Sequence, residues 1–463
     1  MIRILRLTAF LGIAALGFPV QRALASMSPP PPSGGDGAAL PTLPISGRVF
    51  SDIYFPANNT DTSNYRQSSA SLWLQGDPRL GDYGSARFIL TGDEIQNNTV
   101  SAVGGTGSQF RVGLREGYAS YVRSGWDFRF GQQIIPWGKS DAINPTDFLS
   151  AKDYTFFNPD EEVRRLGSVS MMLAWTPAQG NSPVTITFVG TPIFTGSKLL
   201  IPPSAVPAGI TLTGGQQMPP QILGNTETAL KISYAASRWD ASVSVFRGFN
   251  HTPEFAVLSS TTNPATGLPA SFNVGQTFHA IRAVGGDASL TWGKLILRGE
   301  TSYTWTENDN GLNALIQPSH WDSVIGIERP INNDFRVQAQ FVYRVYPLWS
   351  NPALAAGPDP LTTQVDQGIA AANAELLAYQ DPNRPGATFR ISYSNETNGL
   401  DAEIFLLGNF VGGDYLVRPK LSYHWTDALL TTLGLDWYGG PTNRPLGSMQ
   451  VFNSVFAEAK YTF

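Results

Sequence analysis

The chain has 463 residues, of which 42% are hydrophobic, 11% are aromatic and only 14% are charged. This charged fraction lies well below the roughly 25% of an average soluble domain, which argues against an ordinary cytosolic enzyme. No cysteine is present, so disulfide bonds, thiolate catalysis and cysteine-ligated metals are excluded. The 4 histidines are scattered, and no two of them have metal-ligand spacing. We therefore expect no cofactor and no resident metal ion.

Residues 1–25 have the three parts of a secretory signal peptide. Arg3 and Arg6 form a basic start, residues 7–20 are an apolar run, and Ala-Leu-Ala at residues 23–25 is typical of a cleavage site. The run is shorter than the roughly 20 residues of a membrane-spanning helix, so cleavage is favoured over a retained anchor. The mature chain keeps 28 basic and 36 acidic residues, a balance that argues against nucleic acid as a partner.

Residues 26–44 form a segment rich in proline and glycine, with four consecutive prolines at residues 29–32. A segment of this composition cannot pack a core. We predict a periplasmic tail, which is either a plain linker or a docking segment for a partner.

Apolar and polar residues alternate with period two from residue 45 to residue 463, in segments of about ten to fourteen residues. In residues 335–345 one face carries Phe335, Val337, Ala339, Phe341, Tyr343 and Val345, and the other carries Arg336, Gln338, Gln340 and Arg344. Soluble strands average roughly five or six residues, whereas a tilted strand needs about nine to eleven to cross a bilayer. Together with the secretory signal, the pattern predicts an all-β, transmembrane antiparallel β-barrel, because lipid tolerates only a closed sheet.

Eighteen segments are predicted to cross the membrane, an even number as in bacterial barrels, with sixteen as the alternative. The predicted strands are residues 45–54, 66–76, 83–94, 109–123, 126–135, 167–176, 183–191, 226–236, 239–249, 276–291, 294–306, 320–330, 335–346, 387–396, 400–409, 414–425, 428–438 and 450–463. Connections after even-numbered strands are short, and the longest connections all follow odd-numbered strands: 136–166, 192–225, 250–275, 307–319 and 347–386. This parity places both termini in the periplasm and the long loops outside the cell.

One segment breaks the period of two. Residues 361–379 carry Val365, Ile369, Ala372 and Leu376 at spacings of four and three. This spacing predicts an amphipathic helix inside the longest outer loop. The helix could cover the pore, contact a neighbour or pack against the base of its own loop.

Tryptophans gather near the predicted strand ends, where their rings suit the bilayer interface. We expect an aromatic girdle from Trp73, Trp126, Trp175, Trp239, Trp292, Trp305, Trp321, Trp425 and Trp437. Trp137 is the exception, since it lies in a predicted loop.

The last segment ends on Tyr461 and Phe463. It resembles the terminal strand of Gram-negative outer-membrane barrels, in which a C-terminal phenylalanine belongs to the signal that the barrel-assembly machinery reads. The resemblance implies an integral protein of the outer membrane, surrounded by its lipid, with Tyr461 and Phe463 as an assembly signal.

A second resemblance lies in residues 129–147, whose matching positions are Arg129, Gly131, Gln133, Trp137, Gly138, Asn144, Pro145 and Asp147. The pattern is similar to that of several porin-like outer-membrane families, including an uncharacterised proteobacterial family and, more distantly, alginate-export barrels. In them a strand of the form R-x-G-x-Q leads into W-G and N-P-x-D. The resemblance implies that loop 136–166 folds into the lumen and narrows it. Gln132 departs from the basic residue usual there, which leaves the substrate open.

The constriction candidates in this loop are Trp137, Lys139, Asp141, Asn144, Asp147, Asp153, Arg164 and Arg165. Their opposite charges fit either a latch that pins the loop to the barrel wall or a selectivity filter. Acidic residues 160–162 lack the ligand spacing of a known calcium motif.

The polar faces of the predicted strands carry both charges, with more basic than acidic residues. Eighteen strands enclose a lumen too wide for side chains to fill. The pore-lining candidates are Arg111, Arg115, Arg129, Arg298, Arg336, Arg344 and Arg418. Such a set would favour anions, unless each arginine pairs with a neighbouring acid and only keeps the interior wet.

These observations favour a porin-like channel for small hydrophilic solutes, among which anionic solutes could be preferred. The first alternative is an export conduit for a polymer or lipid that works with periplasmic partners. The second is an outer-membrane enzyme, which is disfavoured because no histidine neighbours an obvious Ser/Asp constellation. Besides lipid and the assembly machinery, the partners that we consider are a second copy of the chain and a periplasmic protein.

Overall fold

The computed structural model describes residues 45–57, 66–98, 107–158, 160–199, 210–262, 264–267 and 269–463. The signal peptide and the tail predicted for residues 1–44 lie outside the described residues.

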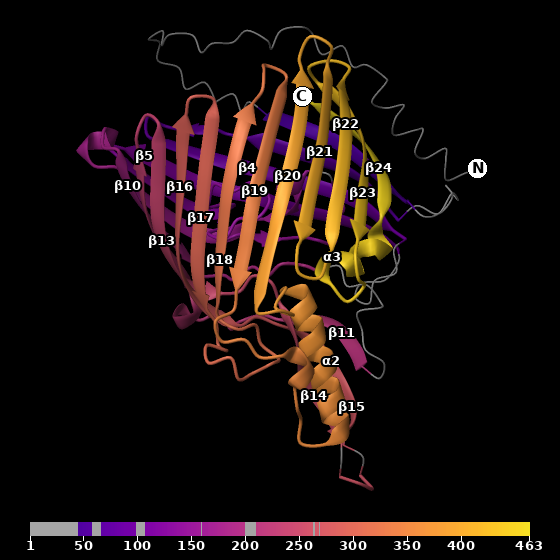
Figure 1. Ribbon diagram of the computed structural model, residues 1–463. Helices are drawn as coiled ribbons and strands as arrows, with labels where there is room; N and C mark the ends of the chain where they lie inside the picture. Colours follow the sequence, from indigo (N-terminus) through magenta and orange to yellow (C-terminus); the bar gives the residue numbers. More distant parts are fainter. Residues whose placement is uncertain are drawn as a thin grey trace, which may run out of the picture. The chain divides into compact units, whose positions relative to one another are not determined.

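Eighteen antiparallel strands form one closed barrel. Figure 1 shows the barrel with the long loops at one end. They are β1 (Ile45–Pro56), β2 (Gln67–Gly76), β4 (Gly84–Asn97), β5 (Gly107–Arg123), β6 (Trp126–Gln133), β9 (Ser168–Trp175), β10 (Val184–Thr191), β12 (Glu227–Ala235), β13 (Trp239–Phe249), β16 (Ala280–Trp292), β17 (Leu295–Trp305), β18 (His320–Pro330), β19 (Phe335–Val345), β20 (Asn383–Asn395), β21 (Leu400–Asn409), β22 (Tyr415–His424), β23 (Leu429–Gly439) and β24 (Ser454–Thr462). The two-residue β3 (Arg79–Leu80) only extends a turn beside β4. Strand β1 pairs with β24 and closes the ring, so the predicted eighteen strands are confirmed.

The two faces of the barrel wall have opposite character. In β13, Val243 and Val245 are 60% and 49% exposed on the outer face, while Ser242 and Ser244 on the inner face are 7% and 4% exposed. A soluble protein would bury the valines and expose the serines. The reversed pattern suits lipid outside and a polar lumen inside.

Eight of the nine girdle candidates are exposed, with exposed fractions from 38% to 70%. The prediction for Trp73 is wrong, because this side chain points inward and is only 6% exposed. Trp73 shares its face of β2 with the buried Ser69 and Ser71. The guanidinium of Arg48 lies 4.0 Å from the centre of the Trp73 ring, so this tryptophan packs in the lumen and does not contact the bilayer interface.

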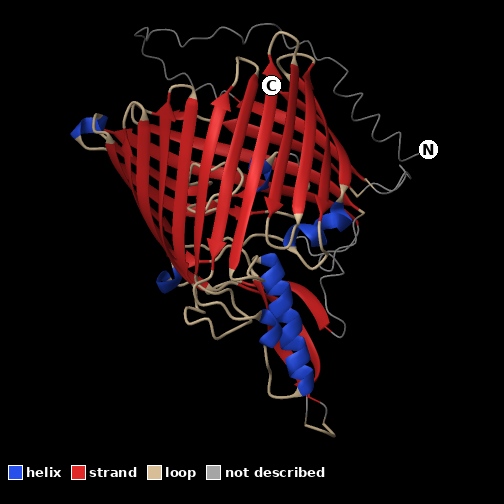
Figure 2. Ribbon diagram, in the orientation of Figure 1, coloured by secondary structure: helices blue, strands red, loops and turns tan. Residues whose placement is uncertain are grey.

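The long loops build a second, smaller sheet that the sequence did not reveal. Strands β11 (Ile210–Gln217), β14 (Glu254–Thr262) and β15 (Pro269–Thr277) form it, next to helix α2 (Pro360–Leu376), as Figure 2 shows. The loop helix is confirmed, and Val365 and Ile369 pack against apolar side chains of β14 and β15. The sheet was missed because β14 is exposed and rich in serine and threonine, with little of the apolar alternation that marks a lipid-facing strand.

The last strand is shorter at its start than predicted. Residues 445–448 and 449–452 form two short helices, α3 (Pro445–Ser448) and η6 (Met449–Phe452), and β24 begins only at Ser454. The side chain of Asn453 is bound to the backbone of Tyr438, with its Nδ2 donating to the carbonyl at 3.1 Å. Residues 450–453 therefore belong to a bend against β23.

Deletion of Phe463 is expected to lower the yield of folded barrel. Phe463 and Gly47 exchange two backbone hydrogen bonds, of 2.8 and 2.9 Å, at the β1–β24 seam. The deletion removes both bonds and the proposed assembly signal. The amount of heat-modifiable protein in outer-membrane fractions measures the effect, with deletion of exposed residues in the 264–267 turn as the control. An unchanged amount would contradict the role of the C-terminus.

Candidate functional site

Residues 136–166, here called the inner loop, connect β6 to β9 through the interior of the barrel. Loop atoms bind inward-facing side chains on several other strands, among them Glu300 on β17, Arg390 on β20, Asp52 on β1 and Glu458 on β24. The loop is therefore fastened to separate parts of the wall.

Glu300 is the main anchor of the first half of the loop. One carboxylate oxygen accepts hydrogen bonds from the backbone N–H groups of Lys139 and Ser140, both at 3.0 Å. The other oxygen accepts from the backbone N–H of Thr146 at 2.7 Å and from its hydroxyl at 2.8 Å. Glu300 is only 3% exposed. Four hydrogen bonds to one buried charge make a strong anchor, since bonds to charged groups exceed those between neutral ones.

The W-G and N-P-x-D motif forms the bend that reaches Glu300. Asn144 donates from Nδ2 to the carbonyl of Trp137 at 2.7 Å, and the Asp147 carboxylate accepts from the Trp137 N–H at 3.3 Å. Its other oxygen forms a salt bridge of 2.8 Å with Arg165. The Trp137 side chain is 6% exposed and packs with Phe148 in a buried apolar cluster. The motif residues are thus hydrogen-bonded to one another.

Gly138→Ala is expected to disrupt this bend. Gly138 has a φ of +93°, and a Cβ there would lie 1.8 Å from Asn144 Oδ1 and 2.6 Å from Glu300 Oε1. An L-residue in this region costs about 1–2 kcal/mol before any clash. Proteolysis of the folded barrel should then cut the inner loop faster. Gly299→Ala, where nothing lies within 4 Å, is the control, and equal cleavage of the two variants would contradict the argument.

A second anchor holds the far half of the loop. Asn158, fully buried, donates from Nδ2 to Asp52 at 2.9 Å and to Glu458 at 3.4 Å. Gln67 on β2 accepts from the Phe157 N–H at 2.7 Å. The sequence analysis did not find these partners, although the alternation places Asp52 on the inner face.

The other predicted loop residues also have partners. Lys139 binds Asp287 at 3.0 Å and also contacts Asp240. Asp141 forms a salt bridge of 2.8 Å with Arg390. Asp153 pairs with Arg111 and Lys198. Lys139, Asp141 and Asp153 thus bind charged side chains of the barrel wall, whereas Asp147 and Arg165 pair within the loop.

The seven predicted pore arginines do not form a free positive patch. Arg115 donates to the loop carbonyls of Val163 and Arg165 at 3.1 and 2.6 Å. The others form salt bridges: Arg111–Asp153 (3.3 Å), Arg129–Asp127 (2.7 Å), Arg298–Glu328 (2.6 Å), Arg336–Glu328 (3.4 Å), Arg344–Asp322 (2.5 Å) and Arg418–Asp436. Arg111 and Arg115 lie four positions apart on β5, whereas Arg129 on β6 is opposite Ser120, so the structure does not bring the three together.

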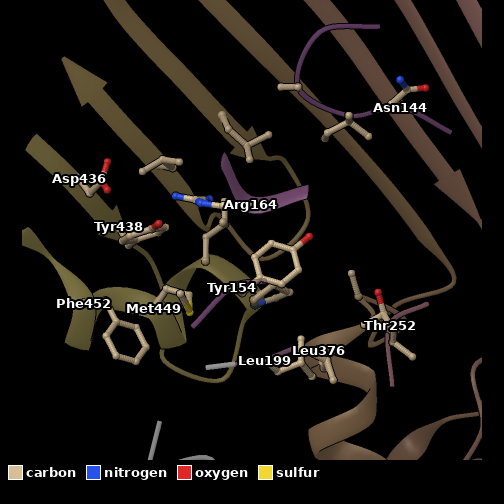
Figure 3. Close-up of a pocket in the computed structure, with 18 of the residues that line it drawn as sticks. Asn144, Tyr154, Arg164, Leu199, Thr252, Leu376, Asp436, Tyr438, Met449 and Phe452 are labelled. Carbon is tan, nitrogen blue, oxygen red and sulfur yellow. The ribbon is translucent and has the colours of Figure 1, made fainter. Parts of the chain in front are cut away.

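A cavity of about 1340 Å³ lies between the inner loop, strands β18 to β24 and helix α2. Figure 3 shows part of its lining. Its six cationic side chains are Arg164, Arg344, Arg390, Arg418, Lys420 and Lys460. Its eight carboxylates are Asp141, Asp147, Asp160, Asp322, Glu375, Glu403, Asp436 and Glu458. Of the seven predicted pore arginines, Arg344 and Arg418 line this cavity, and the lining has more acidic than basic groups.

Among the described residues, no three His, Asp or Glu side chains form a cluster that could hold a metal ion. No helix in this part of the chain is long and apolar enough to cross a membrane.

Comparisons with known proteins find similarity in architecture. No family model and no curated protein matches the chain. It is similar to OccAB4 of Acinetobacter baumannii, with 9% identity, 90% of this chain and 97% of the other covered, and a TM-score of 0.48. The outer-membrane channel DcaP of Acinetobacter baumannii matches with 13% identity, 91% and 97% coverage and a TM-score of 0.38. OmpT, an outer-membrane protein of Vibrio cholerae in a trimer form, matches with 9% identity, 91% and 99% coverage and a TM-score of 0.38.

The closed barrel with an apolar outer face and a polar lumen defines the class: an integral outer-membrane protein of Gram-negative bacteria. Its architecture is a closed antiparallel barrel of eighteen strands. The more distant resemblance to alginate-export barrels stays a prediction, since none of the three matches above is such a barrel.

Proposed function

We propose that the protein is a passive channel for small hydrophilic solutes and that the inner loop sets its width. The observation that carries the proposal is the charged cavity of about 1340 Å³ enclosed by the inner loop and the wall. A polar cavity inside a lipid-embedded barrel suits solutes that cannot dissolve in the bilayer. The anchors at Glu300 and Asn158 would keep the loop in place during passage.

In this proposal the preference for anions belongs to individual side chains and not to the channel as a whole. Six cations face eight carboxylates in the cavity, so the net charge of the lining does not attract anions. We propose that individual guanidinium groups bind anionic groups of solutes, while the channel as a whole selects weakly between small ions.

Conductance in planar bilayers tests the proposal. The refolded mature protein should give stable single-channel steps, with a reversal potential close to zero in a salt gradient. Barrels that conduct only after removal of residues 137–165 would contradict the open channel and would favour the export conduit.

Neutralising Arg111, Arg115 and Arg129 together is expected to leave the reversal potential unchanged. Arg111 and Arg129 are ion-paired, Arg115 is bound to loop carbonyls, and all three lie outside the cavity lining. A shift toward cation selectivity would instead place them on the route of the ions.

We further propose a homo-oligomer, as for the trimeric protein among the structural matches. Chemical cross-linking in isolated outer membranes tests this, and exclusively monomeric protein would contradict it.

A further inference from the structure

Arg164 differs from every other cation of the cavity. The other five each have a carboxylate partner: Asp322 for Arg344, Asp141 for Arg390, Asp436 for Arg418, Glu403 for Lys420 and Glu458 for Lys460. The Arg164 guanidinium forms no salt bridge with a described residue. Nη2 donates to the carbonyl of Asn158 at 3.0 Å, and Nε is buried without a partner. A half-buried guanidinium with unused donors is costly unless something binds it.

The nearest acidic candidates in the lining are already engaged. Asp436 is paired with Arg418. Asp160 caps the short helix η1 (Glu161–Arg164) by accepting from the Glu162 N–H at 3.0 Å. In Figure 3 the nitrogen atoms of Arg164 lie on the side of the cavity that carries Asp436 and Tyr438. Nε is closed off from solvent, but Nη1 forms no hydrogen bond with a described residue and belongs to a side chain that lines the cavity, so Nη1 is the donor that a solute can reach.

Several aromatic side chains line the same cavity. Tyr54 and Phe157 have ring centres 5.4 Å apart, and Phe157 and Phe452 have centres 5.9 Å apart. All three line the cavity, as do Tyr154 and Tyr438. Such rings bind the flat face or edge of another aromatic group.

We propose that Arg164 and these rings form a binding site for a small aromatic carboxylate, with the carboxylate on the guanidinium and the ring among the tyrosines and phenylalanines. The site deepens the proposed function, on which it rests, by naming a substrate class for the channel. The planar guanidinium fork fits a carboxylate in two parallel hydrogen bonds. The surplus of carboxylates in the lining favours a monoanion over a doubly charged phosphate ester.

Calorimetry on the full barrel in detergent, with benzoate as the probe, tests the site. Benzoate should bind, while acetate, which lacks the ring, benzamide, which lacks the charge, and phenyl phosphate, which is doubly charged, should each bind at least about tenfold more weakly. Equal binding of benzoate and benzamide would overturn the role of Arg164. Equal binding of benzoate and acetate would overturn the role of the rings, and phenyl phosphate binding as tightly as benzoate would overturn the preference for a monoanion.

Variants separate the site from general cavity charge. Arg164→Gln should weaken benzoate binding at least about tenfold, and Arg164→Lys should give an intermediate loss because the charge remains without the fork. Lys460→Gln removes one charge from the same lining and should leave benzoate binding as in the wild type. Equal losses in R164Q and K460Q would overturn the assignment, and heat-modifiable migration verifies that each variant is folded.

The failure of the site and the failure of the channel can be told apart. Benzoate should reduce the bilayer current of the wild type at millimolar concentration and that of R164Q much less. Binding in calorimetry with no conductance would overturn the channel and retain the site. Conductance without benzoate binding would overturn the site alone.

Discussion

Replacing Glu300 by glutamine is expected to free the inner loop and to raise the single-channel conductance. Glu300 accepts four hydrogen bonds from Lys139, Ser140 and Thr146 through its two oxygens. A glutamine keeps only one accepting oxygen, and its NH2 group would face N–H or O–H donors from which it cannot accept a hydrogen bond. A loss of about 3 kcal/mol follows, given about 1.5–3 kcal/mol for each hydrogen bond to a charged group. The released state then becomes about a hundredfold more populated. Larger steps with more open-channel noise are the readout.

Glu328→Gln is the matched control for this experiment. Glu328 lies on the neighbouring strand β18, faces the lumen and pairs with Arg298 and Arg336. Within the described part of the chain it has no hydrogen bond or salt bridge to the inner loop. Its removal should leave the conductance as in the wild type. Identical currents from E300Q and the wild type would show that Glu300 does not hold the constriction.

The outer-loop sheet is expected to lose stability as the pH rises from about 5 to about 9. Glu254 on β14 is 2% exposed, and from the described residues its carboxylate accepts only two long hydrogen bonds, of 3.3 and 3.4 Å, both from the Gln317 N–H. Burial raises the pKa of Glu254 from 4.5 to about 8, with a small contribution from Glu307. The folded state therefore holds this proton more tightly than the unfolded chain. Its stabilising effect is complete below about pH 4.5 and is lost as the pH rises through about 8.

Hydrogen exchange of residues 254–277 at pH 6 and pH 9 measures this loss. The pKa of about 8 lies two units above pH 6, so protection should fall about a hundredfold between the two pH values after correction for intrinsic exchange. Glu254→Gln removes the titrating group and should show the same corrected protection at both pH values. A wild type without any pH dependence would mean that Glu254 is solvated or paired in solution.

Local sequence patterns were sufficient to predict the barrel strands. A period of two depends only on neighbouring residues, so segments such as 335–345 reveal both their strand and its inner face without any partner. The helix with Val365 and Ile369 was found in the same way, from its spacing. The prediction of girdle tryptophans from their nearness to strand ends failed for Trp73. This residue lies near a strand end, but it shares its face of β2 with inward-facing residues.

The candidate site depended on contacts between distant positions. Sequence reasoning found the loop, its W-G and N-P-x-D motif and its charges, because turn formers and charge runs are local. It did not find Glu300, which is 154 positions from Thr146. It also did not find Asp52, which is 106 positions from Asn158. Nothing in the local pattern distinguishes these two carboxylates from other inward-facing acids.

The sequence by itself therefore predicted a barrel of about eighteen strands, the lipid-facing and lumen-facing sides of most strands and a long loop over residues 136–166, since these follow from alternation, strand length and turn residues. Only the tertiary structure decided which wall residues hold the loop and which cations remain free, because ion pairing depends on distances across the closed barrel. Arg344 and Arg164 look alike as charges in the sequence. In the barrel the first is neutralised by Asp322, whereas the second lines the cavity and forms no salt bridge with a described residue.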